Sequence, residues 1–316
     1  MCASYRWLSS ENRQGPLSHR TQTNLNNPIP YAWDVYINGA GIVITGAARG
    51  IGAGLARHFH ALGARVVLTD VLGAQVQALA EELDQRRPGS AWAVIADVSN
   101  EEGNRLLIDE SEQLLSNPGS GIDLFFANAG VGSGTVLETT TEAEWQTAFA
   151  VNVHAHRWAA KYLIPRWVER GSGYFCSTAS AAGLLSQIGS ISYSVTKSAA
   201  VAFAESLAIT YGDQGVRVSC LCPQGVNTDM LRQGDSFGAS PATDVVRASG
   251  EVLEPEQVAE VVAAAIEAER FLILPHPQVA DFETRKTADR DRWLAGMRKL
   301  QARIVGGSSS KANDVR

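Results

Sequence analysis

Two residues suited to proton transfer lie one helical turn apart in this sequence. Tyr193 and Lys197 are separated by three residues, a spacing that places both side chains on one face of a helix. A free phenol has a pKa of about 10 and is a poor base at neutral pH. A nearby ammonium favours the phenolate and lowers that pKa. The pair therefore predicts a tunable proton donor and acceptor.

Two upstream polar residues could complete such a site. Ser180 follows the apolar run 173–177, where it could hydrogen-bond a substrate oxygen and hold it beside the phenol. Asn152 lies in the helical segment after the run 123–127, where it could support a water that passes protons to Lys197. A Tyr-x-x-x-Lys pair is common on surface helices by chance, so its meaning depends on the rest of the chain.

The elements that must position these residues alternate between short apolar runs and helical stretches. Each run is rich in β-branched or aromatic residues, which is typical of a strand buried on both faces. Strands linked by helices predict an α/β fold: a single-domain Rossmann-type doubly wound parallel sheet of about seven strands, with helices on both faces and right-handed crossovers. The runs cover 42–45, 66–69, 91–95, 123–127, 173–177, 217–221 and 271–274.

The first run leads directly into a glycine-rich loop. Gly46, Gly50 and Gly52 stand between a predicted strand and a predicted helix, with Arg49 and Ile51 among them. Glycines let bare backbone approach a pyrophosphate, and the helix N-terminus offers free N–H groups and the positive end of a dipole. We therefore predict a dinucleotide site here.

Asp70 and Arg49 point to different forms of the dinucleotide. Asp70 ends the second run, where a carboxylate can bind the adenosine ribose hydroxyls and would repel a 2′-phosphate. Arg49 could instead pair with a 2′-phosphate. We give Asp70 the greater weight and predict NAD, with NADP as the alternative.

Two further motifs follow the third and fourth runs. Asp97-Val98 and Asn128-Ala129-Gly130 both fall at carboxyl ends of strands, where ligands bind in open α/β sheets. Asp97 is placed to meet the adenine edge, and the small residues Ala129 and Gly130 would let the backbone approach the cofactor. Either motif alone could be a plain turn.

Together these residues resemble the short-chain dehydrogenase/reductase family over roughly residues 39 to 275. The resemblance implies that Tyr193 is the general acid or base, and that Ser180 positions and polarises the carbonyl. It also implies that Lys197 binds the nicotinamide ribose and that Asn152 completes the proton relay. The match is carried by 45–52, Asp70, Asp97-Val98, Asn128-Ala129-Gly130, Asn152, 180–183, Tyr193, Lys197 and 223–228.

The stretch 223–228 is assigned only through this resemblance. It implies cofactor contacts for Pro223, Gly225, Val226 and Thr228, with Val226 beside the nicotinamide. The family usually has Pro-Gly here, whereas this chain has Gln224 between the two. The resemblance also implies a homotetramer or homodimer, in which the helix after Asn152 packs against a partner subunit.

We therefore predict an NAD-dependent oxidoreductase that transfers hydride between nicotinamide and a secondary alcohol or ketone. The alternatives are an NADP-dependent carbonyl reductase and a catalytically silent nucleotide-binding scaffold. A silent protein would have no chemical need for all four of Asn152, Ser180, Tyr193 and Lys197. Leu184, Leu185 and Ile188 favour a partly apolar substrate.

The ends of the chain differ from its middle. Residues 1–37 are polar and lack an apolar period, which predicts a flexible extension, either a tail or an organelle transit peptide. Residues 38–278 form the predicted dinucleotide-binding and catalytic domain. Residues 279–316 are predicted to form a C-terminal helix and tail that pack on the same domain or on a partner subunit.

Composition excludes several other classes of protein. The 316 residues are 45% hydrophobic and 19% charged, with a formal net charge of −6, so we expect no nucleic-acid partner. We expect no membrane span, because no apolar stretch approaches the ~20 residues required. The four cysteines lack metal spacing and suit a reducing, cytoplasmic setting. His58-x-His60 and His154-x-His156 also lack the helical spacing of metal ligands, so we expect no metal.

Overall fold

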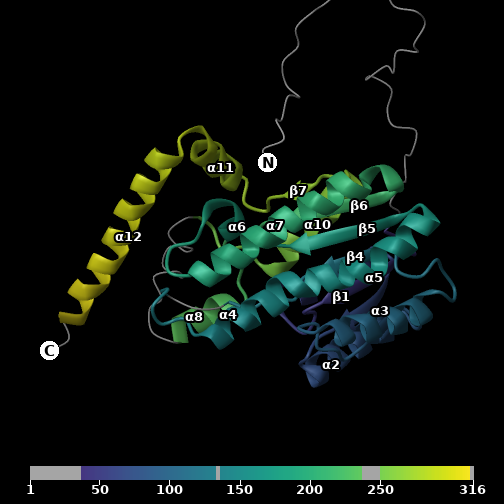
Figure 1. Ribbon diagram of the computed structural model, residues 1–316. Helices are drawn as coiled ribbons and strands as arrows, with labels where there is room; N and C mark the ends of the chain where they lie inside the picture. Colours follow the sequence, from purple (N-terminus) through teal and green to yellow (C-terminus); the bar gives the residue numbers. More distant parts are fainter. Residues whose placement is uncertain (1–36, 133–135, 237–249, 314–316) are drawn as a thin grey trace, which may run out of the picture. The chain divides into compact units, whose positions relative to one another are not determined.

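The computed structural model describes residues 37–132, 136–236 and 250–313 (Figure 1). Side chains are described within these ranges except at 233–236 and 305–313. The extension expected over residues 1–37 lies outside the described residues, apart from Ile37.

One parallel sheet forms the centre of the fold. Its seven strands follow the order β3-β2-β1-β4-β5-β6-β7, and every pair of neighbours is parallel. The reversal of strand order between β1 and β4 is the point at which ligands bind in doubly wound sheets. The predicted fold class is therefore confirmed. The strands are β1 (Gly41–Thr45), β2 (Arg65–Thr69), β3 (Ala91–Ala93), β4 (Leu124–Ala127), β5 (Gly173–Thr178), β6 (Val216–Leu221) and β7 (Leu272–Ile273).

Helices cover both faces of this sheet (Figure 1). Successive side chains of a strand point to opposite faces, so Ile42 and Ile44 enter one hydrophobic core and Val43 enters the other. The first core is closed by α1 (Gly50–Ala61), α2 (Gly73–Arg86) and α10 (Pro255–Glu267). The second is closed by α3 (Glu101–Leu115), α5 (Ala155–Arg170) and α7 (Ile191–Tyr211).

The helical segment after β4 changes its pitch part-way along. It begins as α4 (Glu142–Phe149), whose first turn is closed by a capping box between Thr141 and Glu144. It continues as the π-helix η1 (Ala150–His154) and then as α5. A π-turn inserts one extra residue into a helix and is frequent at functional sites. Asn152 lies inside this turn.

Shorter helices and a C-terminal pair complete the fold. Val279 packs against Leu185 in a small apolar cluster, to which Leu184 and Trp293 add contacts. The substrate-pocket wall expected from Leu184, Leu185 and Ile188 stays a prediction. These elements are α6 (Ala181–Leu185), η2 (Gly212–Gln214), α8 (Asp229–Ser236), α11 (Gln278–Ala288) and α12 (Arg290–Asn313).

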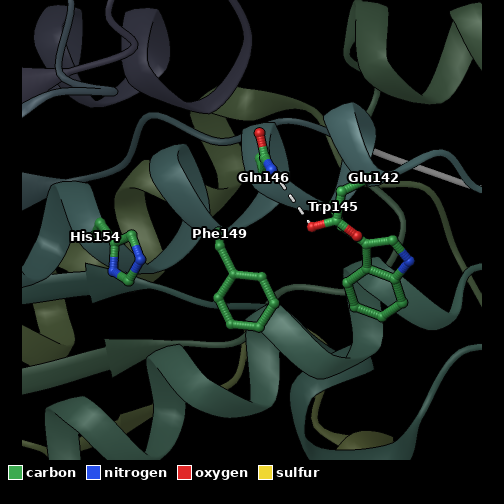
Figure 2. Close-up of a pocket in the computed structure, with 5 residues that line it drawn as sticks. All are labelled: Glu142, Trp145, Gln146, Phe149 and His154. Carbon is green, nitrogen blue, oxygen red and sulfur yellow. Dashed lines mark hydrogen bonds between the residues drawn. The ribbon is translucent and has the colours of Figure 1, made fainter.

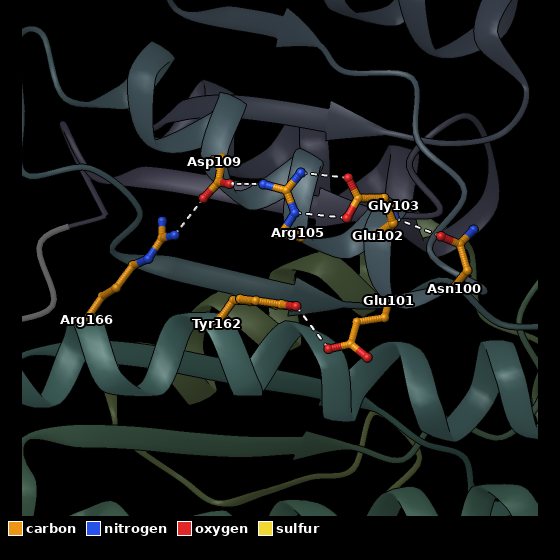
Figure 3. Close-up of polar contacts among 8 residues, drawn as sticks. All are labelled: Asn100, Glu101, Glu102, Gly103, Arg105, Asp109, Tyr162 and Arg166. Atoms are coloured by element: carbon orange, nitrogen blue, oxygen red, sulfur yellow. Dashed lines mark hydrogen bonds and ion pairs between the residues drawn. The ribbon is translucent and has the colours of Figure 1, made fainter.

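The outer surfaces of α3 and α5 are joined by charged side chains (Figure 3). Arg105 bonds Glu102 at 2.6 Å and Asp109 at 2.9 Å along α3, and Arg166 of α5 reaches Asp109 at 2.6 Å. Tyr162 donates to Glu101 at 2.9 Å. These six residues form the α3–α5 surface network, in which Glu102 is exposed and the others are half-buried.

Candidate active site

The candidate residues come from the carboxyl ends of β1, β4, β5 and β6 and from the start of α7. Parallel strands in one sheet end at the same edge, so loops far apart in the sequence meet there. Thr228, which follows β6, illustrates this closeness. A Cβ atom placed on Gly50 would lie 3.0 Å from its Cγ2 atom.

Lys197 is buried beneath this edge. Its side chain is 2% exposed, and its Nζ donates to the Thr178 carbonyl oxygen at 2.9 Å. Nζ also lies 5.7 Å from the centre of the Tyr193 ring. Burial disfavours the ammonium and lowers the pKa of Lys197 to about 8. The helical spacing thus brings the two side chains together as predicted.

The direction of the Tyr193 pKa differs from the one expected from the sequence. Burial disfavours the phenolate and raises the pKa of Tyr193, while a hydrogen bond with Ser180 acts in the opposite direction. The Lys197 ammonium donates to Thr178, so its hydrogen bond goes to the backbone. The expected lowering of the Tyr193 pKa by Lys197 was therefore wrong for this arrangement, and Ser180 is the group that opposes burial.

Ser180 connects the end of β5 to three other parts of the site. Its Oγ accepts from the Ala182 N–H at 3.1 Å and so caps α6. The same hydroxyl lies 3.5 Å from the Pro223 carbonyl oxygen. It is near enough to the Tyr193 phenol to oppose the rise in the pKa of that phenol. The joint action of the serine and the phenol on a substrate stays a prediction.

Asn152 is fully buried and joins β4 to α7. Its Oδ1 accepts from the Val131 N–H at 2.9 Å, and its Nδ2 donates to the Val131 carbonyl at 3.0 Å and to Thr196 Oγ1 at 3.1 Å. Gly130 faces the same place, since a Cβ there would lie 3.2 Å from Lys197 Nζ and 3.4 Å from Asn152 Oδ1. The Asn152 amide is thus a support for the loop beside Lys197.

More polar groups lie behind Lys197. The His156 ring is 1% exposed, and its Nδ1 lies 2.9 Å from Ser177 Oγ. Burial, helped by the charge of Lys197, lowers the pKa of His156 to about 3. Within the described part of the chain, His156 Nε2 and Thr178 Oγ1 are buried without a hydrogen-bond partner. We call Asn152, His156, Ser177, Thr178 and Lys197 the Lys197 cluster.

The glycine loop after β1 has the close approaches that a dinucleotide site needs. Gly46 has a φ of +65° and Gly50 a φ of +55°, which favour glycine. A Cβ on Gly46 would lie 2.8 Å from Ala129 Cα, and one on Gly52 would lie 2.1 Å from the Gly46 carbonyl oxygen. Helix α1 begins here without a side-chain cap at Arg49. Its first N–H groups are therefore suited to a phosphate, and Ile51 stands in this first turn.

Asn128 and Thr45 fasten the glycine loop to β4. Thr45 Oγ1 accepts from the Asn128 and Ala129 N–H groups, both at 2.9 Å. Asn128 Nδ2 donates back to the Thr45 carbonyl at 2.9 Å. The sequence did not single out Thr45 as a site residue. Its position at a strand end directly before the first glycine was the available signal.

Asp70 and Arg49 have different surroundings. Asp70 accepts from the Ala48 N–H at 3.1 Å and from the Leu72 N–H at 3.0 Å. Its carboxylate is therefore held against the glycine loop. Arg49 forms an ion pair of 3.0 Å with Asp229, at 53% and 37% side-chain exposure. Asp229 was also missed by the sequence reasoning, because only the fold brings α8 to this loop.

The two residues of the motif after β3, Asp97 and Val98, lie at the surface and in the core respectively. Asp97 is exposed, and its carboxylate accepts from the Ser99 N–H at 2.9 Å. Val98 is buried in the core beneath α3. The adenine contact expected of Asp97 stays a prediction.

The stretch after β6 is held from two sides. Val226 pairs with Leu253 in an isolated parallel bridge. Gln224, the residue inserted between Pro223 and Gly225, donates its N–H to His276 Nδ1 at 3.2 Å. His276 was not singled out in the sequence, because a lone histidine after a strand has no motif that marks it.

One histidine from each pair bonds a buried serine. His60 of the first pair lies 2.7 Å from Ser90 Oγ, and His156 of the second pair lies 2.9 Å from Ser177 Oγ. Over residues 37–132, 136–236 and 250–313, no group of three His, Cys, Asp or Glu side chains is placed to hold a metal ion.

An aromatic depression of about 580 Å³ lies on α4 and η1 (Figure 2). Trp145, Phe149 and His154 line it together with Glu142 and Gln146. The three rings follow one another along the surface. The Phe149 centroid lies 6.2 Å from that of Trp145 and 6.2 Å from that of His154. This face therefore exposes aromatic surface next to the helix that contains Asn152.

Comparison with known proteins agrees with this geometry. A sequence model of the family described as short chain dehydrogenase matches residues 40–237. The chain belongs to the short-chain dehydrogenase family. It is an NAD(P)-dependent oxidoreductase that acts on CH–OH groups.

Relatives in this family are similar over most of the chain. Meso-2,3-butanediol dehydrogenase of Serratia marcescens is 33% identical over 223 residues, which are 70% of this chain and 85% of that protein. The 1-deoxy-11-beta-hydroxypentalenate dehydrogenase of Streptomyces exfoliatus is 36% identical over 73% of this chain and 81% of its own. A short-chain dehydrogenase/reductase from Burkholderia phymatum, solved with NAD, has a TM-score of 0.73 at 28% identity and covers 81% of this chain and 95% of its own.

This short-chain dehydrogenase has helices of several lengths. In the portion that the structure describes, none of them is both long and apolar enough to cross a membrane.

Proposed function

We propose that the chain is an NAD-preferring dehydrogenase that interconverts a secondary alcohol and a ketone, with Tyr193 as the general acid or base. One observation carries the proposal: the buried Lys197 Nζ lies 5.7 Å from the centre of the Tyr193 ring, and Ser180 is near enough to that phenol to lower its pKa. A phenol near a hydroxyl and a cation is suited to give and take a proton at one substrate oxygen.

The steps follow from the positions of these side chains. In the oxidative direction, Ser180 donates to the substrate oxygen and holds it next to Tyr193. Tyr193 takes the hydroxyl proton while the carbinol carbon loses a hydride, so the C–O single bond becomes a carbonyl. Bound NAD supplies the acceptor of that hydride. In the reductive direction the carbonyl oxygen takes the proton back from Tyr193.

Lys197 and Asn152 serve this proton transfer from behind. Lys197 would bind the nicotinamide ribose hydroxyls and, once it faces them, would favour the Tyr193 phenolate. Asn152 keeps the loop at Val131 in place by its two hydrogen bonds with that backbone. The relay would lead from Tyr193 through Lys197 and past Asn152 to solvent.

The residues that would hold the cofactor line the carboxyl edge of the sheet. The lack of Cβ atoms at Gly46 and Gly52 and the uncapped start of α1 fit a pyrophosphate. The set is Gly46, Arg49, Gly50, Ile51, Gly52, Asp70, Asp97, Val98, Asn128, Ala129, Gly130, Tyr193, Lys197, Pro223, Gly225, Val226 and Thr228.

Two contacts support NAD over NADP. The backbone N–H groups of Ala48 and Leu72 fix the Asp70 carboxylate at the end of β2, where it would repel a 2′-phosphate. Arg49 is already paired with Asp229, so a 2′-phosphate would have to compete with that carboxylate. Burkholderia phymatum provides a structural relative solved with NAD.

Separate titrations with NADH and NADPH, followed by nicotinamide fluorescence, test this proposal. NADH is expected to bind at least about tenfold more tightly, a difference of about 1.4 kcal/mol. Tighter binding of NADPH would overturn the NAD preference and indicate a carbonyl reductase. Binding of neither would overturn the dinucleotide site on which the proposal depends.

Further proposals concern substrate, assembly and location. Met230 is 43% exposed and faces Gly132 beside the site, since a Cβ on that glycine would lie 3.6 Å from Met230 Cγ. This supports a partly apolar substrate.

The aromatic depression supports a homodimer or homotetramer through α4 and α5. Cys176, Cys220 and Cys222 are free thiols, which supports a cytoplasmic location, and residues 38–278 would form the catalytic domain.

A further inference from the structure

His276 is a buried side chain whose three described hydrogen-bond partners are backbone atoms. It follows β7 in the connection to α11 and is 2% exposed. Its Nδ1 accepts from the Gln224 N–H at 3.2 Å. Its Nε2 lies 3.1 Å from the Gly225 carbonyl oxygen and 3.2 Å from the Glu251 carbonyl oxygen. One ring therefore ties together the loop after β6 and the backbone that leads to Leu253.

The partners of His276 fix its tautomer. A backbone N–H can only donate, so Nδ1 must carry a lone pair, and carbonyl oxygens can only accept, so Nε2 must carry the proton. Protonation of Nδ1 would place two donors face to face. Burial lowers the pKa of His276, in agreement with the neutral ring that the contacts require.

Gln278 extends this contact to the side chain of Gln224. Gln278 Nε2 donates to Gln224 Oε1 at 3.2 Å, and Gly250 packs on the pair, since a Cβ there would lie 2.6 Å from Gln278 Nε2. Gln224 is the residue by which this chain departs from the Pro-Gly pattern. His276 and Gln278 thus hold both the backbone and the side chain of the inserted residue.

We infer that His276, with Gln278, is a positioning residue that fixes Gly225 and Val226 for the nicotinamide half of the cofactor. This rests on the proposed function, which places Val226 beside the nicotinamide. The pyrophosphate and adenosine half is held elsewhere, by the glycine loop and Asp70. Loss of His276 should therefore weaken binding of the nicotinamide half and spare the other half.

NADH and ADP-ribose, which lacks the nicotinamide, separate the two halves. In His276→Leu, the Kd for NADH is expected to rise about tenfold, because the hydrogen bonds that hold the Gln224, Gly225 and Glu251 backbone are lost. The Kd for ADP-ribose is expected to stay within about twofold. The KM for NAD should rise with the Kd, while kcat at saturating NAD changes less.

His60 offers a matched control at the opposite edge of the sheet. It is 5% exposed and bonds Ser90, which directly precedes β3. His60→Leu should lower the thermal midpoint as His276→Leu does, yet leave the ratio of the two Kd values unchanged. Equal weakening of NADH and ADP-ribose in His276→Leu, or no weakening of either, would overturn the inference.

Three milder variants keep the test decisive if His276→Leu fails to fold. His276→Asn retains an acceptor near Nδ1, and His276→Gln retains a donor near Nε2, so each should recover part of the NADH affinity. Gln278→Leu should weaken NADH alone, by less than His276→Leu. If NADH binding is unchanged in all three, the inference is wrong. If the wild-type protein binds neither ligand, the proposed function fails, and the inference fails with it.

Discussion

The α3–α5 surface network and the Lys197 cluster are both rich in polar groups, but they differ in their access to water. Arg105, Asp109 and Arg166 of the surface network are 37–40% exposed, and each has an oppositely charged partner. Lys197 is 2% exposed, and its hydrogen bond goes to a neutral carbonyl. The surface network thus keeps charged groups partly exposed (Figure 3), whereas the Lys197 cluster holds its polar groups in the interior.

This difference in exposure predicts that substitutions in the surface network are tolerated better than substitutions in the Lys197 cluster. Exposed ion pairs are screened by solvent and contribute little to stability. A buried ammonium destabilises the fold because burial disfavours its charged form, and a buried neutral histidine does so once the pH falls below its unfolded pKa. In the Lys197 cluster that cost is consistent with a catalytic use, since perturbed pKa values gather at functional sites.

The largest expected effect concerns the phenol beside the cluster. Tyr193→Phe removes the acid–base group but keeps the ring, so turnover should fall by roughly 10²–10⁴-fold. The Kd for NADH should remain within about twofold, because only the hydroxyl of Tyr193 is removed and the other cofactor-binding residues are unchanged. Steady-state kinetics and fluorescence titration measure the two quantities. Turnover close to the wild-type rate would contradict the assignment of Tyr193.

His156 should make the fold sensitive to acid. Its folded pKa of about 3 lies below the ordinary 6.5, so the unfolded chain binds the proton more readily between these values, and stability falls as the pH falls. Between pH 6.5 and 4 this single group should remove about 3 kcal/mol from the free energy of unfolding. Urea unfolding of wild type and His156→Gln should show the difference. Parallel losses in the two proteins would contradict a neutral buried His156.

Lys197 should act in the alkaline range. Its folded pKa of about 8 lies below the ordinary 10.5, so the unfolded chain keeps the proton longer, and its penalty on the fold shrinks as the pH rises. Relative to Lys197→Met, the wild type should gain about 2 kcal/mol between pH 8 and 10. Contributions from cysteines and tyrosines cancel in this comparison. No relative gain would indicate that Lys197 is solvated rather than buried.

The smallest effect is expected in the α3–α5 surface network. Arg166→Ala removes its ion pair with Asp109 and should change the free energy of unfolding by no more than about 1 kcal/mol. Urea unfolding at low and high salt measures it. A loss of several kcal/mol would contradict the contrast between the two regions.

The architecture could be predicted from the sequence because its signals are local. Runs such as 66–69 are short, mostly apolar and followed by a helical stretch, and the runs became parallel strands. The spacing of Tyr193 and Lys197 on one helix likewise fixed their shared face. The glycine loop was expected to allow close backbone approach, and Gly46 lies directly against Ala129, which follows β4.

The unpredicted parts depend on contacts between distant segments. His276 bonds Gln224 across the long connection from β6 to β7, and Asp229 reaches Arg49 only because α8 returns to the first loop. The rise in the pKa of Tyr193 was not expected, because it comes from burial, and burial has no local sequence pattern.

Transfer of deuterium from NADH labelled at the reactive nicotinamide carbon tests the central claim most directly. The wild-type protein would be incubated with both C4 epimers of the labelled cofactor and a panel of ketones, and the alcohols analysed by mass spectrometry. We predict that one epimer delivers deuterium to the carbinol carbon and that Tyr193→Phe, while still binding NADH, delivers far less. Absence of label from every alcohol, despite tight binding of NADH, would contradict the account.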